Sequence, residues 1–225
     1  MFSPIVITKL FIPQPHPELV HRPRLLAQLN QGLTRKLTLI SAPAGFGKTT
    51  LVADWAQRLQ LSDTRMAWIS LDKDDNDPSL FLTYLIVAIK QVGGIHENLA
   101  ESLQDMLQSP QSPPIKDIVT TVINAVAELS SRLIIVFDDY HLIEERFVNE
   151  ALVFLIEYLP PQLHLVIVTR DDPYLPVARM RAKGEMNELR AADLRFTTVE
   201  IQEFLQQKLG VDLSLDEIAG LEMHT

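Results

Sequence analysis

The sequence lacks cysteine and any cluster of basic residues, and each absence excludes a class of protein. Without cysteine, the 225-residue chain has no disulfide framework and no cysteine-type zinc site, which fits the cytosol. Its 20 Lys and Arg residues are outnumbered by 29 Asp and Glu residues, and the net charge is −9. Binding along a nucleic-acid backbone requires clustered cations. Direct DNA binding by this chain is therefore not expected.

Long apolar runs are also missing. The longest, LFLTYLIVAI at residues 80–89, is too short to span a bilayer and predicts a buried core helix. The first residues, MFSPIVITKLFIPQP, contain no basic leader followed by a long apolar stretch, so no signal peptide is predicted. Apolar residues still make up 47% of the chain, enough for a sizeable core. We therefore expect a cytoplasmic protein without membrane contact.

Short runs rich in Ile, Val and Leu alternate with helical patterns. The runs lie at residues 36–41, 66–71, 132–137 and 163–168, with a weaker candidate at 185–190. Apolar residues recur at helical spacing over residues 115–130 and 146–159, and another helix is expected over 51–59. Alternation of buried strands with helices predicts an α/β fold. We expect a three-layer sandwich around a parallel sheet of about five strands.

Capping signals mark the ends of several helices. Asp77 followed by Pro78 predicts an N-cap with proline at the first helical position. Near the end of the chain, Thr197 with Glu200 forms one capping box, and the pair Ser214 and Glu217 forms another. The chain is accordingly divided into an α/β domain over 1–196 and the beginning of a helical domain, expected to be truncated, over 197–225.

The stretch SAPAGFGKTT follows the first predicted strand and precedes a helix, which is the context of a phosphate-binding P-loop. Backbone N–H groups and the helix N-terminus would surround a β-phosphate, and Gly45 and Gly47 would let the backbone come close. Lys48 would contact the β- and γ-phosphates, and Thr49 would bind Mg²⁺. The predicted nucleotide-binding residues are Ala42, Pro43, Ala44, Gly45, Phe46, Gly47, Lys48, Thr49 and Thr50.

This P-loop pattern is relaxed at one position. The usual pattern is G-x-x-x-x-G-K-[ST], and Ala42 stands where it begins with glycine. A small residue should still fit that turn. The alternative interpretation is a glycine turn that only connects a strand to a helix.

Three charged residues follow the ends of two other predicted strands. Asp138 is expected to hold Mg²⁺, and Asp139 to polarise a water molecule near the γ-phosphate. Arg170 is expected to reach the γ-phosphate, because ligands of open α/β sheets lie beyond the strand carboxyl ends. Lys48, Asp139 and Arg170 are thus the catalytic candidates. The alternatives are two solvated acids at a strand end and an ordinary surface arginine.

Three further residues have weaker assignments. His141 follows the two acids, but we favour a structural role for it. Arg179 and Arg181 are interpreted as part of a solvated face rather than as an arginine finger for another subunit. The six histidines do not pair at metal-ligand spacing.

Several longer stretches carry a family resemblance. The segments LTLISAPAGFGKTTLVADWA, AWISLDKDDNDPSLFLTYL, VFDDYHLI, LHLVIVTRDDP and LRAADLRFTTVEIQEFL occur in this order. Together they resemble the N-terminal ATPase module of the MalT-like, large LuxR-type transcription regulators, which belong to the STAND class. The resemblance implies a five-stranded sheet with the phosphate-loop strand near its centre, and ATP or ADP with Mg²⁺. It also implies that Val20, His21 and Arg22 lie against the adenine.

The same resemblance implies a switch in which ADP holds the resting state, and in which ATP with an inducer permits self-association. The first hypothesis is therefore a slow ATPase that acts as a switch and contacts other regulator domains or further copies. The second is a nucleotide-binding interaction module that does not turn over usefully. A kinase is a more distant third, since no acceptor-substrate site is marked. The inducer-binding and DNA-binding parts of such regulators do not fit into what remains after residue 197.

Overall fold

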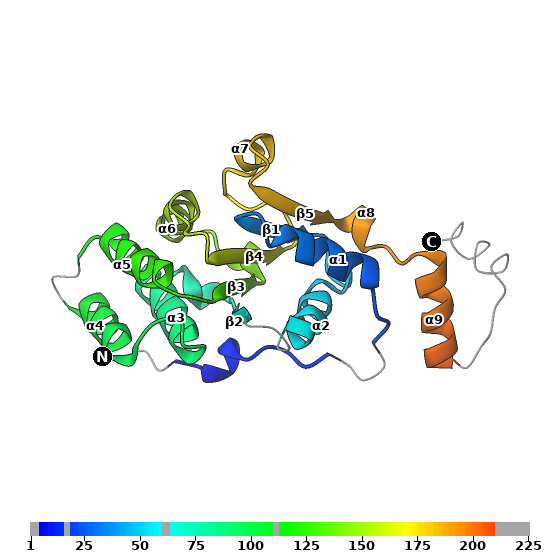
Figure 1. The fold of residues 1–225 in the computed structure, drawn as a ribbon, viewed down its shortest axis with the longest axis horizontal. Helices are drawn as coiled ribbons and strands as arrows, with labels where there is room; N and C mark the ends of the chain where they lie inside the picture. Colours follow the sequence, from blue (N-terminus) through cyan, green and yellow to red (C-terminus); the bar gives the residue numbers. More distant parts are fainter. Residues whose placement is uncertain (1–4, 16–18, 60–63, 110–112, 210–225) are drawn as a thin grey trace.

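Five parallel strands form a single sheet in the order β2-β3-β4-β1-β5 (Figure 1). The structure is a computed structural model that describes residues 5–15, 19–59, 64–109 and 113–209. The strands are β1 (Leu37–Ser41), β2 (Thr64–Ser70), β3 (Arg132–Asp138), β4 (Leu163–Thr169) and β5 (Met186–Arg190). All five predicted strands are present, including the weaker candidate. The phosphate-loop strand β1 lies one position from the central strand, β4.

Helices cover both faces of the sheet, as the sandwich prediction requires. On one face lie α1 (Pro23–Gly32) and α2 (Lys48–Leu59). On the other lie α3 (Pro78–Gln91), α4 (Glu97–Gln108), α5 (Ile115–Ala127), α6 (Arg146–Glu157) and α7 (Val177–Ala182). Successive strand residues point to opposite faces, so Phe137 and Ile167 join the second core while Val136 and Val168 join the first. The P-loop NTPase-like α/β fold class is thereby confirmed.

The longest apolar run forms a core helix, as predicted. Asp77 caps α3 by accepting hydrogen bonds from the N–H groups of Ser79 and Leu80 at 2.8 and 2.9 Å, and Pro78 occupies the first turn. Phe81, with most of the apolar residues that follow it, is buried. Within the described ranges, every helix is too short or too polar to reach across a lipid bilayer.

Five further elements complete the described part of the chain. They are the 3₁₀ helices η1 (Ile7–Leu10), η2 (Lys73–Asn76) and η3 (Tyr140–Leu142), and the α-helices α8 (Ala191–Leu194) and α9 (Thr198–Leu209). The Thr197–Glu200 capping box is present, with hydrogen bonds of 2.8 and 3.3 Å. The second box, Ser214 with Glu217, lies outside the described residues. The domain boundary at residue 197 stays a prediction.

The carboxyl ends of three adjacent strands meet at one edge of the sheet. In the strand registers, Ser41 of β1 lies beside Thr169 of β4, and Asp138 ends β3 beside Ser70 of β2. The phosphate loop, the two acids and Arg170 each begin where one of these strands ends. The topology therefore brings to one edge the residues that the sequence presents far apart.

Candidate nucleotide-binding site

The phosphate loop takes a conformation that requires glycine at two positions. It leaves β1 after Ser41 and enters α2 at Lys48. Gly45 and Gly47 have φ angles of 85° and 72°, in the left-handed region that residues with a Cβ rarely adopt. Ala42 is 2% exposed and belongs to the core beneath the loop, so a small residue is accommodated at the start of the pattern.

Lys48 lies across the loop that precedes it. Its Nζ donates hydrogen bonds to the carbonyl oxygens of Ala42 at 2.7 Å and Pro43 at 2.9 Å, and the residue is only 8% exposed. Burial and the nearby positive charge of Arg170 hold the pKa of Lys48 below its ordinary value. The ammonium group is thus held by two neutral acceptors in a place that favours an incoming anion.

Thr49 and Asp138 meet at the mouth of the loop, although 89 residues separate them. The Thr49 hydroxyl donates to Asp138 Oδ1 at 3.1 Å, and the backbone N–H of Asp139 donates to the same oxygen at 3.0 Å. Asp138 is 3% exposed. Burial, reinforced by the charge of Asp139, raises the pKa of Asp138 to about 6 against the opposing effect of the Thr49 hydrogen bond.

A divalent cation fits this pair of oxygen ligands. Burial and the neighbouring charge of Asp139 disfavour the ionised Asp138 carboxylate more than the charge of Lys48 favours it, so a further cation would stabilise it. A hydroxyl with a carboxylate is a donor set that suits Mg²⁺. In the described part of the chain, no group of three or more His, Cys, Asp or Glu side chains forms a complete protein cage for a metal. A cation held by Thr49 and Asp138 would therefore complete its shell with phosphate oxygens and water.

Asp139 stands in an unusual backbone conformation. Its φ of 56° and ψ of 36° lie in the left-handed region, and no other described residue besides glycine has a positive φ. Asp and Asn tolerate this region better than most residues, and such strain concentrates at functional sites. The Asp139 side chain is 49% exposed, and its Oδ1 lies 3.8 Å from Nδ1 of His141.

Arg170 lies near enough to both His141 and Lys48 for its charge to act on them. Burial lowers the pKa of His141, and the positive charge of Arg170 lowers it further. Arg170 also lowers the pKa of Lys48, so it acts electrostatically on both the phosphate loop and the segment after the acids. Arg170 is exposed, as a group able to reach an incoming phosphate would be.

The acidic turn SLDKDDNDP has a structural role that sequence reasoning missed. Asn76 Oδ1 accepts hydrogen bonds from the N–H groups of Glu144 and Glu145, both at 2.8 Å, and its Nδ2 donates to the carbonyl of Leu142 at 2.8 Å. The turn therefore holds the segment that follows Asp139. The only signal in the sequence was an amide residue among acids, directly before the capping Asp77.

A cavity of about 300 Å³ opens beside the phosphate loop and has mainly apolar walls. Its lining includes Val20, Arg22, Phe46, Thr50, Asp54 and Phe196. His21 does not line it. The His21 side chain is 55% exposed, and its Nδ1 accepts a hydrogen bond from Arg58 at 2.8 Å. Of the three residues expected to lie against adenine, Val20 and Arg22 line this cavity and His21 lies outside it.

One wall of this cavity is fastened by an arginine clamp, which we define as Arg22, Arg24 and Glu200. Arg22 donates to the carbonyls of Leu194 at 2.8 Å and Arg195 at 2.7 Å and to Glu200 Oε2 at 3.1 Å, and its guanidinium lies 4.8 Å from the ring centre of Phe196.

Arg24 completes the clamp from the same helix terminus, donating to Glu200 Oε1 at 3.1 Å. Burial pushes the pKa of Glu200 upward, but hydrogen bonds from Arg24 and Arg22 outweigh it and hold that pKa below its ordinary value. The clamp joins the start of α9 to the start of α1. Glu200 lies too far along the chain from Arg22 and Arg24 for the sequence spacing to predict this contact.

We expect Glu200→Gln to lower stability and weaken ADP binding. Removing one charge from a buried ion-paired network costs about 1–3 kcal/mol, and the wall carrying Phe196 loses its anchor. Thermal unfolding and calorimetric titration with ADP measure the two effects. Gln206→Ala is the control, because Gln206 is exposed on the same helix. An unchanged melting temperature and ADP affinity would show that the clamp is not needed to hold this wall.

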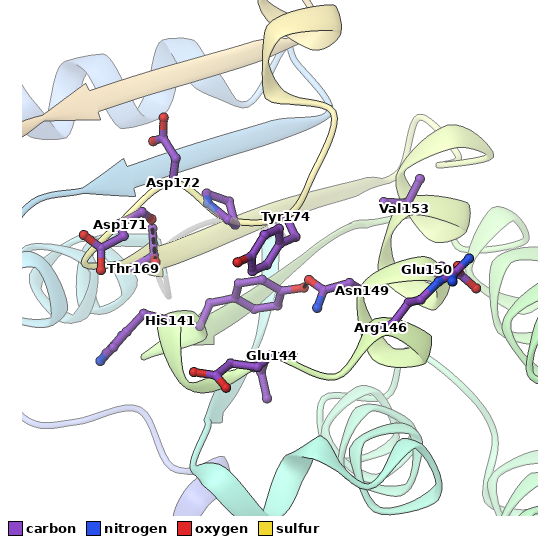
Figure 2. A pocket seen from close by; sticks show the side chains of 13 residues that line it. His141, Glu144, Arg146, Asn149, Glu150, Val153, Thr169, Asp171, Asp172 and Tyr174 are labelled. Atoms are coloured by element: carbon purple, nitrogen blue, oxygen red, sulfur yellow. Dashed lines mark hydrogen bonds and ion pairs between the residues drawn. The ribbon is translucent and has the colours of Figure 1, made fainter.

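A second, larger cavity of about 660 Å³ lies between the end of β4 and the η3–α6 region (Figure 2). Figure 2 shows Thr169 approaching it from the end of β4, Asp171 from the segment after β4, and Glu144 and Asn149 from the η3–α6 region. His141 and Tyr174 also line it. This cavity shares no lining residue with the smaller one, so His141 faces a different space from the one that Val20 and Arg22 line.

Arg179 and Arg181 make ion pairs within the chain. Nη2 of Arg179 lies 3.5 Å from Oε1 of Glu157, and Nη2 of Arg181 lies 2.7 Å from Oε1 of Glu188. Their side chains are 62% and 54% exposed. This arrangement agrees with the interpretation of a solvated face.

Comparison with known proteins assigns the family. The sequence family described as Nephrocystin 3, N-terminal, matches residues 18–170. The chain belongs to this family. The nephrocystin 3 N-terminal match contains the phosphate loop, both acids and Arg170, and so includes the whole candidate site except the segment around Glu200.

Curated relatives confirm the MalT-like resemblance. The chain is 34% identical over 223 residues to the HTH-type transcriptional regulator MalT of Cronobacter sakazakii, covering 96% of this chain and 24% of MalT. It is also 34% identical to the serine/threonine-protein kinase PknK of Mycobacterium tuberculosis over 222 residues, covering 99% of this chain and 20% of PknK. The chain thus spans a quarter or less of the length of these relatives.

Solved structures confirm the fold. A STAND protein with a tetratricopeptide repeat sensor from Pyrococcus horikoshii matches 98% of this chain and 30% of its own, with a TM-score of 0.68 and 19% identity. The Orc1 protein of Aeropyrum pernix, solved in complex with DNA, matches 88% of this chain and 51% of its own, with a TM-score of 0.54 and 16% identity. At these identities the likeness concerns architecture alone.

Proposed function

We propose that this chain binds ADP and Mg²⁺-ATP at the phosphate loop and hydrolyses ATP slowly, as the nucleotide switch of a MalT-like regulator. The contact between Thr49 and Asp138 carries the proposal most directly, since it joins the hydroxyl that follows the P-loop lysine to a buried carboxylate 89 residues away. The phosphate loop and Asp138 both lie at the carboxyl ends of their strands, where open α/β sheets bind ligands, and this supports the same site.

Binding would begin with the phosphates. Lys48 would exchange the carbonyls of Ala42 and Pro43 for phosphate oxygens, which are stronger acceptors for an ammonium group. The first N–H groups of α2 have no partner within the helix and would donate to the same anion. Thr49 and Asp138 would hold Mg²⁺, which supplies neutralisation of the charge on the β- and γ-phosphates.

Hydrolysis would then require a positioned water molecule and charge stabilisation. Water attacks the γ-phosphorus, the bond from that phosphorus to the ADP oxygen breaks, and the proton of the water passes to Asp139 and on to solvent. Arg170 would stabilise the charge on the transferred group. Both side chains are substantially exposed, so this edge excludes water poorly and we expect slow turnover.

A non-hydrolysing interaction module is the alternative, and it rests on the same exposure of Asp139 and Arg170. Release of ADP from ATP by purified protein, measured beside a Lys48→Ala control, decides between the two. Turnover above the control supports the switch ATPase. Tight ATP binding with no turnover above the control supports the interaction module.

The wider role follows from the relatives and is part of the proposal. MalT is a transcriptional regulator, and this chain corresponds to a quarter of it. We propose a cytoplasmic module that contacts other regulator domains or further copies of itself and does not contact DNA directly. The net charge of −9 supports the last point, because a DNA backbone would be repelled.

We expect the Mg²⁺-dependent gain in ADP affinity to fall at acid pH. Asp138 must be ionised to hold the cation, and its pKa is raised to about 6. The gain should be complete above about pH 7 and fall about tenfold per pH unit below 6, as protons compete for the carboxylate. Titration with ADP, with and without Mg²⁺, between pH 5 and 8 measures it.

Asp138→Asn is the control for that titration. The phosphates of ADP titrate identically with either protein, so the difference between the two proteins isolates Asp138. A gain that varies with pH in the same way in both proteins would assign the titration to the nucleotide and remove Asp138 from the site.

A further inference from the structure

Asp54 places a carboxylate on the wall of the smaller cavity. It lies one helical turn beyond Thr50, so the two share a face of α2, and both line the cavity with Val20 and Phe46. The residue is 5% exposed. A carboxylate removed from water to this extent requires hydrogen-bond donors.

Within the described ranges, hydrogen bonds from the protein reach one oxygen of this carboxylate. Arg58 Nε donates to Asp54 Oδ1 at 3.3 Å, a long hydrogen bond. Oδ2 lies 3.5 Å from Nδ1 of His21, but that nitrogen already accepts a hydrogen bond from Arg58 at 2.8 Å and therefore carries no proton to donate. Among the described residues, none donates a hydrogen bond to Oδ2.

We propose that Asp54 selects the base of the nucleotide, by accepting a hydrogen bond from the 6-amino group of adenine. This inference rests on the proposed nucleotide site and names its specificity. An ionised carboxylate only accepts hydrogen bonds, and acidic side chains recognise exocyclic amino groups of bases in this way. Guanine and hypoxanthine carry an oxygen at the same position, which would face the carboxylate without a proton between them.

The surrounding walls suit the rest of the ring. Phe46, Val20 and Phe196 line the cavity and offer apolar contact to a flat base, which is tolerant of base identity. Discrimination between bases must therefore come from polar groups of the cavity. A site that hydrogen-bonds a particular group of the ligand rejects analogues that lack this group. Among the described residues that line this cavity, Asp54 is the one with a carboxylate side chain.

The first measurement uses the unaltered chain. Calorimetric titration with ADP, GDP and IDP in the presence of Mg²⁺ compares three nucleotides with identical phosphates. We expect ADP to bind at least about tenfold more tightly than either of the others. IDP lacks the 2-amino group of guanine, so equal rejection of IDP and GDP assigns the discrimination to the atom at position 6.

The second measurement uses a matched pair of variants. Asp54→Asn keeps the shape of the side chain but supplies an amide N–H that can donate to an oxygen at position 6. The preference for ADP over IDP should then fall about tenfold or more. Arg58→Gln removes the Arg58–Asp54 ion pair and keeps the carboxylate, so its preference should remain that of the unaltered chain. Circular dichroism verifies that both variants fold.

Each outcome has a single meaning. Binding of IDP as tightly as ADP by the unaltered chain overturns the role of Asp54 even if no variant folds. An unchanged preference in Asp54→Asn, or an equal loss of preference in Arg58→Gln, also overturns it while leaving the nucleotide site intact. Absence of binding to all three nucleotides overturns the proposed function itself.

Discussion

Lys48→Ala is expected to weaken ADP and ATP binding by about 100-fold or more while the protein stays folded. Hydrogen bonds to a charged donor contribute about 1.5–3 kcal/mol each, and Lys48 is the residue of the loop able to provide them from a side-chain cation to the phosphates. No neighbouring lysine replaces it within the stretch SAPAGFGKTT. Calorimetric titration with both nucleotides in the presence of Mg²⁺ measures the loss.

The fold should survive because the contacts of Lys48 are few and local. Its Nζ is bonded to two carbonyls of the loop itself, and Pro43 is exposed, so water can replace the ammonium group there. Burial also lowers the pKa of Lys48, which means that the charged form gains little from this place when no phosphate is bound.

Lys183→Ala is the matched control, since it removes one positive charge from an exposed position. It should leave binding and the melting temperature unchanged. A large drop in melting temperature for Lys48→Ala, with loss of circular-dichroism signal, would make Lys48 a structural residue and would leave the phosphate contact unsupported.

The features that sequence reasoning could predict depend on neighbours in the chain. The runs that became β1, β3 and β4 are apolar at most positions because helices cover both faces of the sheet there. The glycine loop between a strand and a helix is a local pattern. Asp77 caps its own helix two and three residues away. Each of these features is decided by residues within one or two turns.

The features that were missed depend on residues brought together by the sheet order. The arginine clamp joins Arg22 to Glu200, and the acidic turn is tied through Asn76 to Glu144. Spacing along the chain carries no signal for such contacts. The left-handed conformation of Asp139 was also not predictable, because an aspartate adopts it only where the surroundings require it.

Asp54 illustrates a different limit. In the sequence, Asp54 and Arg58 stand four residues apart on a helix, which is the ordinary pattern of a stabilising surface pair. Only the fold shows that the acid is buried and faces the cavity beside the phosphate loop. The spacing of Asp54 and Arg58 is therefore explained by a helix-surface ion pair until the burial of Asp54 is known, and the second role of Asp54 cannot be seen in the sequence.

Asp139→Asn should lower ATP hydrolysis about 100-fold or more while leaving ADP and ATP binding near that of the unaltered chain. An amide cannot take the proton from the attacking water. Asparagine tolerates the left-handed backbone at this position as well as aspartate does, so the turn after β3 is kept. Asp138→Asn should instead weaken Mg²⁺-dependent binding, since it removes the buried ligand beside Thr49.

The two variants should also differ in the pH dependence of Mg²⁺ binding. Asp139 helps to raise the pKa of Asp138, so Asp139→Asn should move the contribution of Asp138 to the pH dependence of Mg²⁺ binding to lower pH. Asp138→Asn should remove that contribution and leave only the titration of the nucleotide phosphates. Single-turnover ADP release and titrations with and without Mg²⁺ measure both effects on the same preparations. Equal loss of binding in the two variants would refute the division of roles, because it would mean that both acids hold the metal and neither positions the water.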